Sequence, residues 1–304
     1  MKKFVIRVLL WSAVSAVSVS SSAAQQIAFT WDDLPAHSSL PPGQTRQEIA
    51  TNILSAMKEA NLPPAFGFVN GATAEREPLS APVLKQWRSA GLPLGNHTWS
   101  HMNLNEHSLA DWESDVLKNE PLLESSMGTQ DWHWLRFPYL AEGDTPQKRD
   151  AARKFLAEHH YKIAGVTMSF GDYLYNEPYA RCSAKNDTAA IDKLKASYLA
   201  AARATITYTR AMSKALYGRD IPYVLLMHIG ALDARILPQL LNLYRENGFR
   251  FIRLEDAEKD PFYRYDVHLS LPSGPDTLEE AMRKRNLPIP ERPQLDLDLN
   301  GICR

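Results

Sequence analysis

Two adjacent acidic residues lie where a strand is expected to end. Asp32 and Asp33 directly follow residues 27–31, an apolar run with the composition of a strand. Neighbouring side chains on an extended backbone point to opposite sides, so one carboxylate can bind a metal ion while the other faces a substrate. A lone pair of aspartates is more often a solvated acidic turn, so the interpretation depends on what else the chain brings to this point.

His97 and His101 supply a second group of this kind. A spacing of four residues brings two imidazoles onto one side of a helical turn, as a shared metal ion requires. The chain has nine histidines, so one such pair is expected by chance in roughly one chain in four. Residues 91–95, Gly-Leu-Pro-Leu-Gly, indicate a loop or short turn before the pair. With Asp33, the two histidines leave open metal positions, as in catalytic zinc sites.

Two further segments carry reactive side chains. Arg136 begins the sequence Arg-Phe-Pro-Tyr, which ends at Tyr139, and its guanidinium can hold a carboxylate through two parallel hydrogen bonds. A surface arginine beside a buried aromatic residue is the alternative. His228 follows the apolar residues 225–227. Considered alone, it is equally well explained as a core histidine whose hydrogen bonds are satisfied.

The elements that must position these residues alternate between strands and helices. Strands are expected at residues 27–31, 65–69, 134–137, 161–167, 221–227 and 249–252. Helices are expected between them, including one that Ser108 opens and Pro121 interrupts, and a long one from residue 187 or 188 to about 217. This alternation predicts a mostly parallel sheet or barrel with helices outside, whose functional residues lie at the carboxyl ends of the strands.

Composition excludes some classes of protein. The chain has 304 residues, of which 44% are hydrophobic and 23% charged, with a formal net charge of −1. These values are ordinary for a soluble globular protein. They give no sign of the basic patch that nucleic-acid binding usually requires.

The first residues predict export. Lys2, Lys3 and Arg7 precede an apolar stretch at residues 8–19, and small residues follow as far as Ala24. This is the pattern of a secretory signal that is cleaved after Ala24. An uncleaved anchor is the alternative, but a spanning helix needs about 20 apolar residues. We therefore expect a periplasmic or secreted protein that keeps no stable membrane anchor.

The two cysteines, Cys182 and Cys303, permit a disulfide in an exported protein. Their even number favours a bridge only weakly, and two unrelated thiols are the alternative. They are far apart in the sequence, so they do not predict a zinc site.

Taken in order, these motifs resemble those of the polysaccharide deacetylases, also known as carbohydrate esterase family 4 or the NodB homology domain. The resemblance runs from about residue 27 to 252 and rests on Thr-Trp-Asp-Asp-Leu-Pro at 30–35, the histidine pair, Arg-Phe-Pro-Tyr and the histidine after residues 225–227. It implies an α/β fold, a distorted (β/α)7 barrel. We expect a signal peptide at residues 1–24, a catalytic domain at 25–262 and an irregular proline-rich tail at 263–304, packed on the barrel.

The resemblance also implies a role for each site residue. Asp33, His97 and His101 resemble the metal ligands. The remaining residues resemble the general base (Asp32), the arginine that holds it (Arg136), the backbone N–H that binds the oxyanion (Tyr139) and the general acid (His228). The implied activity is metal-assisted removal of acetyl groups, chiefly N-acetyl, from a carbohydrate such as peptidoglycan or a chitin-like oligosaccharide. Zinc is the expected divalent ion, and cobalt, nickel or iron also suit these ligands.

The sequence departs from the family pattern at several positions. Leu34 stands where a glycine is usual, and leucine restricts the backbone, so we expect a narrower pocket. Of a further family motif, only Asp172 and Tyr173 are kept, with Ser169 at its start, and we expect Asp172 to pair with Arg136. His37 lies near the acids, as a substrate contact or simply as an exposed loop residue.

The region after Tyr173 elaborates the basic barrel. Tyr175, Tyr179 and Arg181 suggest either packing or the lining of a sugar groove, and aromatic packing is the commoner role.

Two other functions remain open from the sequence. The same site on the same fold can open a small cyclic amide or imide, for which a narrowed pocket is suited. A non-catalytic glycan-binding protein is the second alternative, but it would need a broken site, and the core positions are all present (Asp32, Asp33, His97, His101 and His228). The identity of the glycan, the choice between N- and O-acetyl groups and the oligomeric state are not determined by the sequence.

Overall fold

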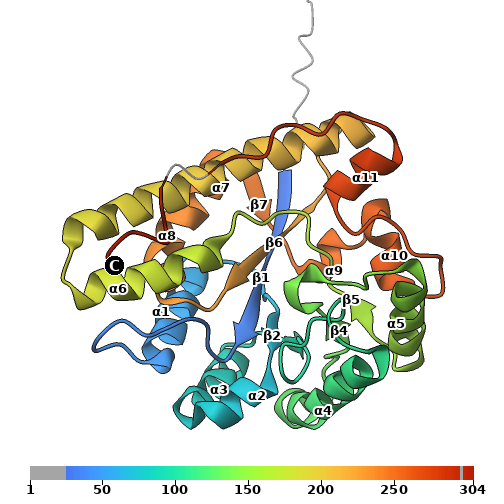
Figure 1. Cartoon of the computed structure of the whole chain (residues 1–304), viewed down its shortest axis with the longest axis horizontal. Helices are drawn as coiled ribbons and strands as arrows, with labels where there is room; N and C mark the ends of the chain where they lie inside the picture. The colour runs from blue at the N-terminus through green and yellow to red at the C-terminus, as the bar shows by residue number, and fades with distance from the viewer. Residues whose placement is uncertain (1–24, 295–296) are drawn as a thin grey trace, which may run out of the picture.

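The computed structural model describes residues 25–294 and 297–304, shown in Figure 1. The predicted signal peptide, residues 1–24, lies outside the described residues. Among the helices of the described part, none combines the length and the apolar character needed to cross a membrane.

A seven-stranded parallel sheet forms the centre of the molecule, with the order β5-β4-β3-β2-β1-β6 and with β7 also paired to β1. Its central strand, β1, pairs with β7 at its start, with β6 along its middle and with β2 at its end. The strands are β1 (Gln25–Leu34), β2 (Gly67–Val69), β3 (Leu94–Asn96), β4 (Trp134–Leu135), β5 (Lys162–Ile163), β6 (Tyr223–His228) and β7 (Phe249–Phe251).

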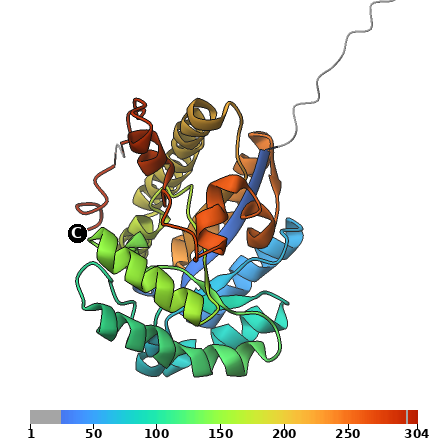
Figure 2. The same ribbon diagram turned by 90° about the vertical axis from the view of Figure 1, so that its right-hand side faces the viewer.

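The sheet curls until its two edges approach each other. After β5 the chain runs to β6, where Met168 forms an isolated parallel bridge with Leu225 and the amide of Leu226 donates to the Met168 carbonyl at 3.1 Å. Helices surround this curled sheet, as Figures 1 and 2 show. The predicted distorted (β/α)7 barrel is therefore confirmed.

Side-chain caps fix where the chain turns from loop into helix. Thr45 and Glu48 form a reciprocal capping box at the start of α1, and Ser108 and Asp187 cap α4 and α7 through their side chains. The main helices are α1 (Arg46–Glu59), α2 (Gly71–Arg76), α3 (Pro82–Ser89), α4 (Leu109–Met127), α5 (Pro146–Glu158), α6 (Asn176–Ala184), α7 (Thr188–Tyr217), α8 (Ala231–Glu246) and α9 (Leu254–Ala257).

Two elements differ from the expectation. Strand β3 was missed because it has three residues with a glycine in the middle, which weakens any strand pattern. Gly95 is needed there, since a Cβ would lie 2.7 Å from the Trp134 carbonyl oxygen. Helix α4 is not interrupted at Pro121 but continues through it. Val116 and Leu123 are buried on either side, and this burial outweighs the cost of proline within a helix.

The tail at residues 263–304 is not wholly irregular, as the sequence had suggested. It contains α10 (Arg264–Val267) and α11 (Leu278–Lys284). Leu278, Ala281 and Met282 on α11 are buried at helical spacing, and this short apolar stripe is too brief to show in the sequence pattern. Beyond α11 the chain runs along α7 toward α6, as Figures 1 and 2 show.

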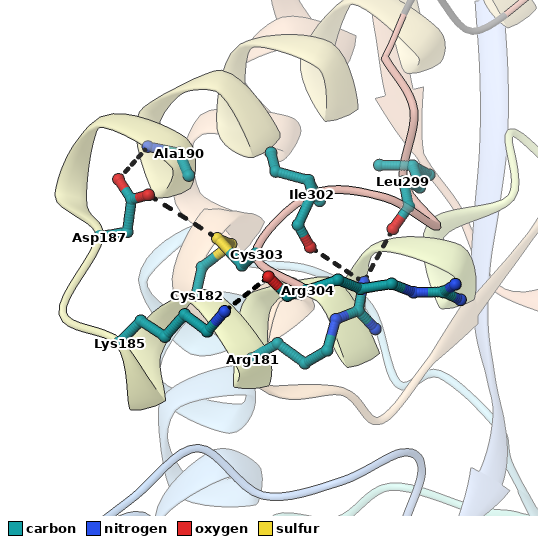
Figure 3. The surroundings of a disulfide bond; sticks show 9 residues. All are labelled: Arg181, Cys182, Lys185, Asp187, Ala190, Leu299, Ile302, Cys303 and Arg304. Carbon is teal, nitrogen blue, oxygen red and sulfur yellow. Dashed lines mark hydrogen bonds between the residues drawn. A yellow bond between two sulfur atoms is a disulfide. The ribbon is translucent and has the colours of Figure 1, made fainter.

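A disulfide between Cys182 on α6 and Cys303 attaches the end of the tail, as Figure 3 shows. Beside it, Arg181 donates hydrogen bonds to the carbonyls of Leu299 and Ile302, at 2.9 and 3.2 Å. The bridge joins residues 121 positions apart, so it closes a long loop and restricts the unfolded chain strongly.

We expect Cys303→Ser to lower the free energy of unfolding by about 2–4 kcal/mol, because the unfolded chain regains its loop entropy. The melting temperature of the oxidised protein, measured by calorimetry, checks this. The matched control is the double variant Cys182→Ser/Cys303→Ser, which should have the same melting temperature as the single variant. An unchanged melting temperature in both would contradict the role of the bridge.

Candidate active site

Three potential metal ligands converge at the carboxyl ends of β1 and β3. The Oδ1 atom of Asp33 lies 3.5 Å from Nε2 of His97 and 3.4 Å from Nε2 of His101. One ligand atom from each residue falls within a group no wider than 4.8 Å. The two histidines belong to the loop after β3 and not to a helix, so their spacing works through a turn, in which Thr98 and His101 have positive φ angles.

The state of these side chains fits a divalent cation. The Oδ1 atom of Asp33 is buried and has no hydrogen-bond partner within the described residues, and such an oxygen is costly unless something positive satisfies it. His97 donates from Nδ1 to the Arg136 carbonyl at 2.7 Å, which leaves the Nε2 lone pair free for a metal. Two nitrogens, one carboxylate and room for further ligands form the donor set of a catalytic zinc-like site.

The ionisation of the same groups agrees with this. Burial, followed by the charge of His97, lowers the pKa of His101 to about 4, so its imidazole is neutral at neutral pH. Burial raises the pKa of Asp33, but a hydrogen bond from His37 and the charges of His228, His97 and His101 outweigh it and hold that pKa well below its usual range. A neutral imidazole and an ionised carboxylate are the forms that bind metals.

Asp32 is held by a buried arginine. Arg136 donates from Nη1 to both carboxylate oxygens of Asp32, at 3.1 and 3.2 Å. The rest of its guanidinium donates to the Thr30 hydroxyl at 3.1 Å and to the Ala164 carbonyl at 2.8 Å. Both charged groups are almost completely buried, so the carboxylate is oriented by a fixed partner and not by water.

His228 lies on the other side of the site. In the β1–β6 pairing, Asp32 and His228 are direct partners, so two adjacent parallel strands set the separation of these two groups. His228 donates from Nδ1 to Asp172 at 3.1 Å, and its backbone amide donates to the same carboxylate at 2.6 Å. The other ring nitrogen, Nε2, is therefore the one available to a substrate.

The expected pairing of Asp172 with Arg136 is wrong. Asp172 belongs to the 3-10 helix Asp172–Tyr175, which packs beside the end of β6. Arg136 instead donates its hydrogen bonds to Asp32, Thr30 and Ala164. Burial lowers the pKa of His228, but the charge and hydrogen bond of Asp172, with smaller contributions from Asp33 and Asp32, raise it to about 10. Asp172 therefore keeps His228 protonated.

Tyr139 lies at the rim of this group. It belongs to the 3-10 helix Pro138–Leu140 and has a φ angle of 58°, and the first N–H groups of a helix have no partner within the helix. Its side chain is 68% exposed, and its ring centroid lies 4.5 Å from that of His101.

His37 is a member of the site that the sequence did not assign. It donates from Nδ1 to Oδ2 of Asp33 at 2.8 Å, and its ring lies 4.8 Å from that of His228. Arg46 donates to the carbonyl oxygens of His37 and Ser38, which fixes the loop. The only available signal was a spacing of four residues from Asp33, and a loop histidine at that spacing is usually exposed.

The expectation for Leu34 is wrong, whereas the packing role favoured for the two tyrosines is confirmed. Leu34 does not narrow a pocket, because its side chain is fully buried in the core, against the backbone of Gly67. Tyr175 and Tyr179 are also buried and pack in the core, whereas Arg181 binds the tail. None of these four side chains lines the site.

The family model described as polysaccharide deacetylase matches residues 20–162. This segment holds β1 to β4 and the first residue of β5, and with them Asp32, Asp33, the histidine pair and the arginine. The match covers 143 of the chain's 304 residues, and it confirms the predicted resemblance to the polysaccharide deacetylases.

A curated relative is a peptidoglycan-N-acetylglucosamine deacetylase from Bacillus cereus, 29% identical over 114 residues, which are 38% of this chain and 36% of the relative. The match thus spans about a third of that protein's length. Two solved structures share the fold. A polysaccharide deacetylase from Bacillus cereus is 19% identical, covers 75% of this chain and 91% of its own, and has a TM-score of 0.51. A carbohydrate esterase family 4 pseudoenzyme from Bacillus anthracis is 15% identical and has a TM-score of 0.53. The match covers 77% of this chain and 66% of the pseudoenzyme.

We expect His37→Phe to weaken zinc binding by about 10- to 100-fold, because Asp33 loses the donor that orients it. His37→Asn should weaken zinc binding less, because the asparagine amide N–H can replace the Nδ1 donor of His37. Competition with a chromophoric chelator measures both affinities. His107→Phe, at an exposed histidine, is the control. Equal zinc affinity in His37→Phe and the unaltered protein would contradict this role.

Proposed function

We propose that the protein is a metal-dependent deacetylase that removes acetyl groups, chiefly N-acetyl, from a carbohydrate such as peptidoglycan or a chitin-like oligosaccharide. One observation carries the proposal: the buried, unpartnered Oδ1 of Asp33 faces two histidines. The family match and the deacetylase from Bacillus cereus support the class of substrate. The proposed ion is zinc, with cobalt, nickel and iron as alternatives.

The proposed ligands are Asp33, His97 and His101. A bound divalent ion would supply Lewis-acid chemistry, by polarising the acetyl carbonyl and making water more acidic. Asp32 acts as general base on the attacking water, and the hydrogen bonds from Arg136 fix the orientation of its carboxylate. The backbone N–H of Tyr139 donates to the oxyanion as it forms, and one such donor is typically worth about 3 kcal/mol.

His228 is proposed to protonate the departing amine or alcohol. It is suited to this because Asp172 occupies Nδ1 and raises its pKa, so Nε2 carries a proton at neutral pH. His228 and Asp32, on adjacent strands, would supply the acid and the base that hydrolysis of an amide needs.

The two alternatives gain little from the geometry. A pseudoenzyme shares the fold, so the fold alone does not establish catalysis, but here each proposed catalytic side chain contacts the partner that its role requires. The cyclic amide alternative depended on a pocket narrowed by Leu34, and Leu34 is buried away from the site. Exposed aromatic rings of Tyr139 and Tyr173 beside the centre suit a larger, carbohydrate substrate.

We further propose that the protein acts outside the cytoplasm, in a periplasm or in the medium. The disulfide between Cys182 and Cys303 supports this, because such bonds persist in oxidising compartments.

The metal-loaded protein is expected to bind about one divalent ion and to release acetate from N-acetylated glycans. Asp33→Ala and His101→Ala should lose metal and turnover together, because each removes a ligand. Asp32→Asn should keep the metal and slow turnover by about 10²- to 10⁴-fold. Metal analysis and an acetate assay on chitooligosaccharides, peptidoglycan and acetylated xylan provide the measurements. Absence of acetate release from every substrate would contradict the proposed function.

The pH profile tests the role of Asp172. A general acid works only while protonated, so activity should fall as the pH rises through the pKa of His228. In Asp172→Asn the negative charge that raises this pKa is lost, so the fall should begin at a lower pH. A bound cation would reduce the contribution of Asp33, so both proteins are compared metal-loaded, as kcat/KM against pH. An unchanged alkaline limb would contradict this role.

A further inference from the structure

The segment that carries Asp172 contacts the segment that carries His228 at two points. At the first, Asp172 accepts hydrogen bonds from the Nδ1 atom and the backbone amide of His228. The second lies four residues further along, at Asn176, which is the first residue of α6 and is completely buried. Both segments follow residue 162, where the family match ends. The chemistry proposed for His228 uses only the first contact.

Asn176 forms the second contact with both ends of its side-chain amide. Its Nδ2 atom donates to Oδ2 of Asp233 at 2.7 Å, and its Oδ1 atom accepts from the backbone amide of Leu232 at 2.9 Å. Leu232 lies in the first turn of α8, where Gly230 precedes the helix and supplies no capping side chain. Asn176 therefore satisfies one of the free N–H groups of α8. The amide lies directly over Gly230, since a Cβ there would come within 2.2 Å of it.

Asp233 holds the amide of Asn176 from behind. The backbone N–H of Leu232 can only donate, so it fixes the amide oxygen toward α8 and the nitrogen toward Asp233. The other carboxylate oxygen of Asp233 accepts from the Tyr198 hydroxyl of α7 at 2.6 Å. Asp233 and Tyr198 are 1% and 0% exposed. This buried, fully paired group joins α6, α7 and α8 beside the site.

We propose that Asn176, held by Asp233, is a positioning residue for the general acid. This inference rests on the proposed function, in which His228 protonates the leaving group. Because Asn176 follows Asp172 by only four residues, its contact with α8 fixes the 3-10 helix that carries Asp172. It thereby fixes where the carboxylate of Asp172 meets Nδ1 of His228. Without that contact the 3-10 helix moves away from β6, and Asp172 no longer holds the imidazole or its proton.

The titratable groups that face His228 come from the 3-10 helix, the end of β1 and the loops after β1 and β3: Asp172, Tyr173, Asp32, Asp33, His37 and His101. Burial lowers the pKa of His228, and Asp172 makes the largest of the contributions that raise it. Behind Asp172, burial and then the charge of Asp172 raise the pKa of Asp233 to about 7. Within the described residues His228 forms no hydrogen bond or ion pair with the three candidate metal ligands. Displacing Asp172 should therefore change the pKa of His228 and leave the metal bound.

The test is Asn176→Ala in the zinc-loaded full chain, with the titration of His228 as the measurement. Nuclear magnetic resonance follows the imidazole signal of His228 against pH, and the signal is assigned by its absence in His228→Gln. We expect His228 to titrate about one pH unit lower or more, because Asp172 loses its fixed position. A general acid works only while protonated, so the alkaline fall of kcat/KM should begin at a lower pH as well. Zinc affinity should stay the same.

Ser213→Ala is the matched control. Ser213 is also fully buried on α7, and its hydroxyl accepts from the amide of Ile221 and donates to the Arg219 carbonyl, both at 2.9 Å, before the start of β6. Each variant leaves a backbone N–H without its partner, so both should melt at a lower temperature. Only Asn176→Ala should change the titration of His228. An unchanged titration in Asn176→Ala, or an equal change in Ser213→Ala, would overturn the proposal.

A second pair of variants covers the case in which Asn176→Ala does not fold. Asp233→Ala and Asp233→Asn both remove the charge of Asp233, but only the asparagine keeps an acceptor for the amide of Asn176. Asp233→Ala should therefore lower the pH at which His228 titrates by more than Asp233→Asn does. Equal effects of the two variants would show that charge alone acts, and the positioning role would be wrong.

Acetate release is measured separately, so that the two proposals can fail independently. If no glycan yields acetate while Asn176→Ala still lowers the pH at which His228 titrates, the proposed function fails and the positioning role stands. If acetate is released but the titration of His228 is the same in Asn176→Ala and the unaltered protein, the positioning role fails and the proposed function stands.

Discussion

The buried ion pair between Arg136 and Asp32 is the interaction on which the rest of the site depends. Removing either charge from water is costly, and the cost is offset only if every donor and acceptor is satisfied. Arg136 therefore needs Thr30 of β1 and the carbonyl of Ala164 after β5 as well as Asp32. These contacts tie the ends of three strands together. Because Asp32 is held in this way, its neighbour Asp33 is left to face the histidines.

The same site holds one neutral and one protonated histidine, and the surroundings of each explain the difference in pKa. Burial and a second imidazole lower the pKa of His101 to about 4, so its imidazole is neutral at neutral pH. His228 is also buried, yet Asp172 raises its pKa to about 10, so its imidazole is protonated at neutral pH. Groups of one type whose environments push their pKa values apart are the usual mark of assigned acid, base and ligand roles. The identity of the neighbour, more than burial, decides which role each histidine can perform.

Sequence reasoning located the barrel and the site because the carboxyl ends of parallel strands meet at one edge of a sheet. Asp32, Asp33 and His228 each follow an apolar run, so their convergence needed no knowledge of side-chain positions. The contacts that it missed are between segments with no regular pattern. Asp172 sits in a short 3-10 helix and His37 in a loop, and neither periodicity nor spacing determines which partner a loop side chain meets. Strand β3 and helix α11 were too short for their patterns to be recognised.

The candidate reacting groups and the additions outside the barrel belong to different parts of the chain. The base, the candidate ligands and the arginine belong to the segment that matches the family, where strand pairing fixes them to one another. Helix α7 and the tail are added outside the barrel, and the tail is attached to α6 by a covalent bond and by hydrogen bonds from Arg181. These contacts hold the tail without involving any of the groups at the strand ends.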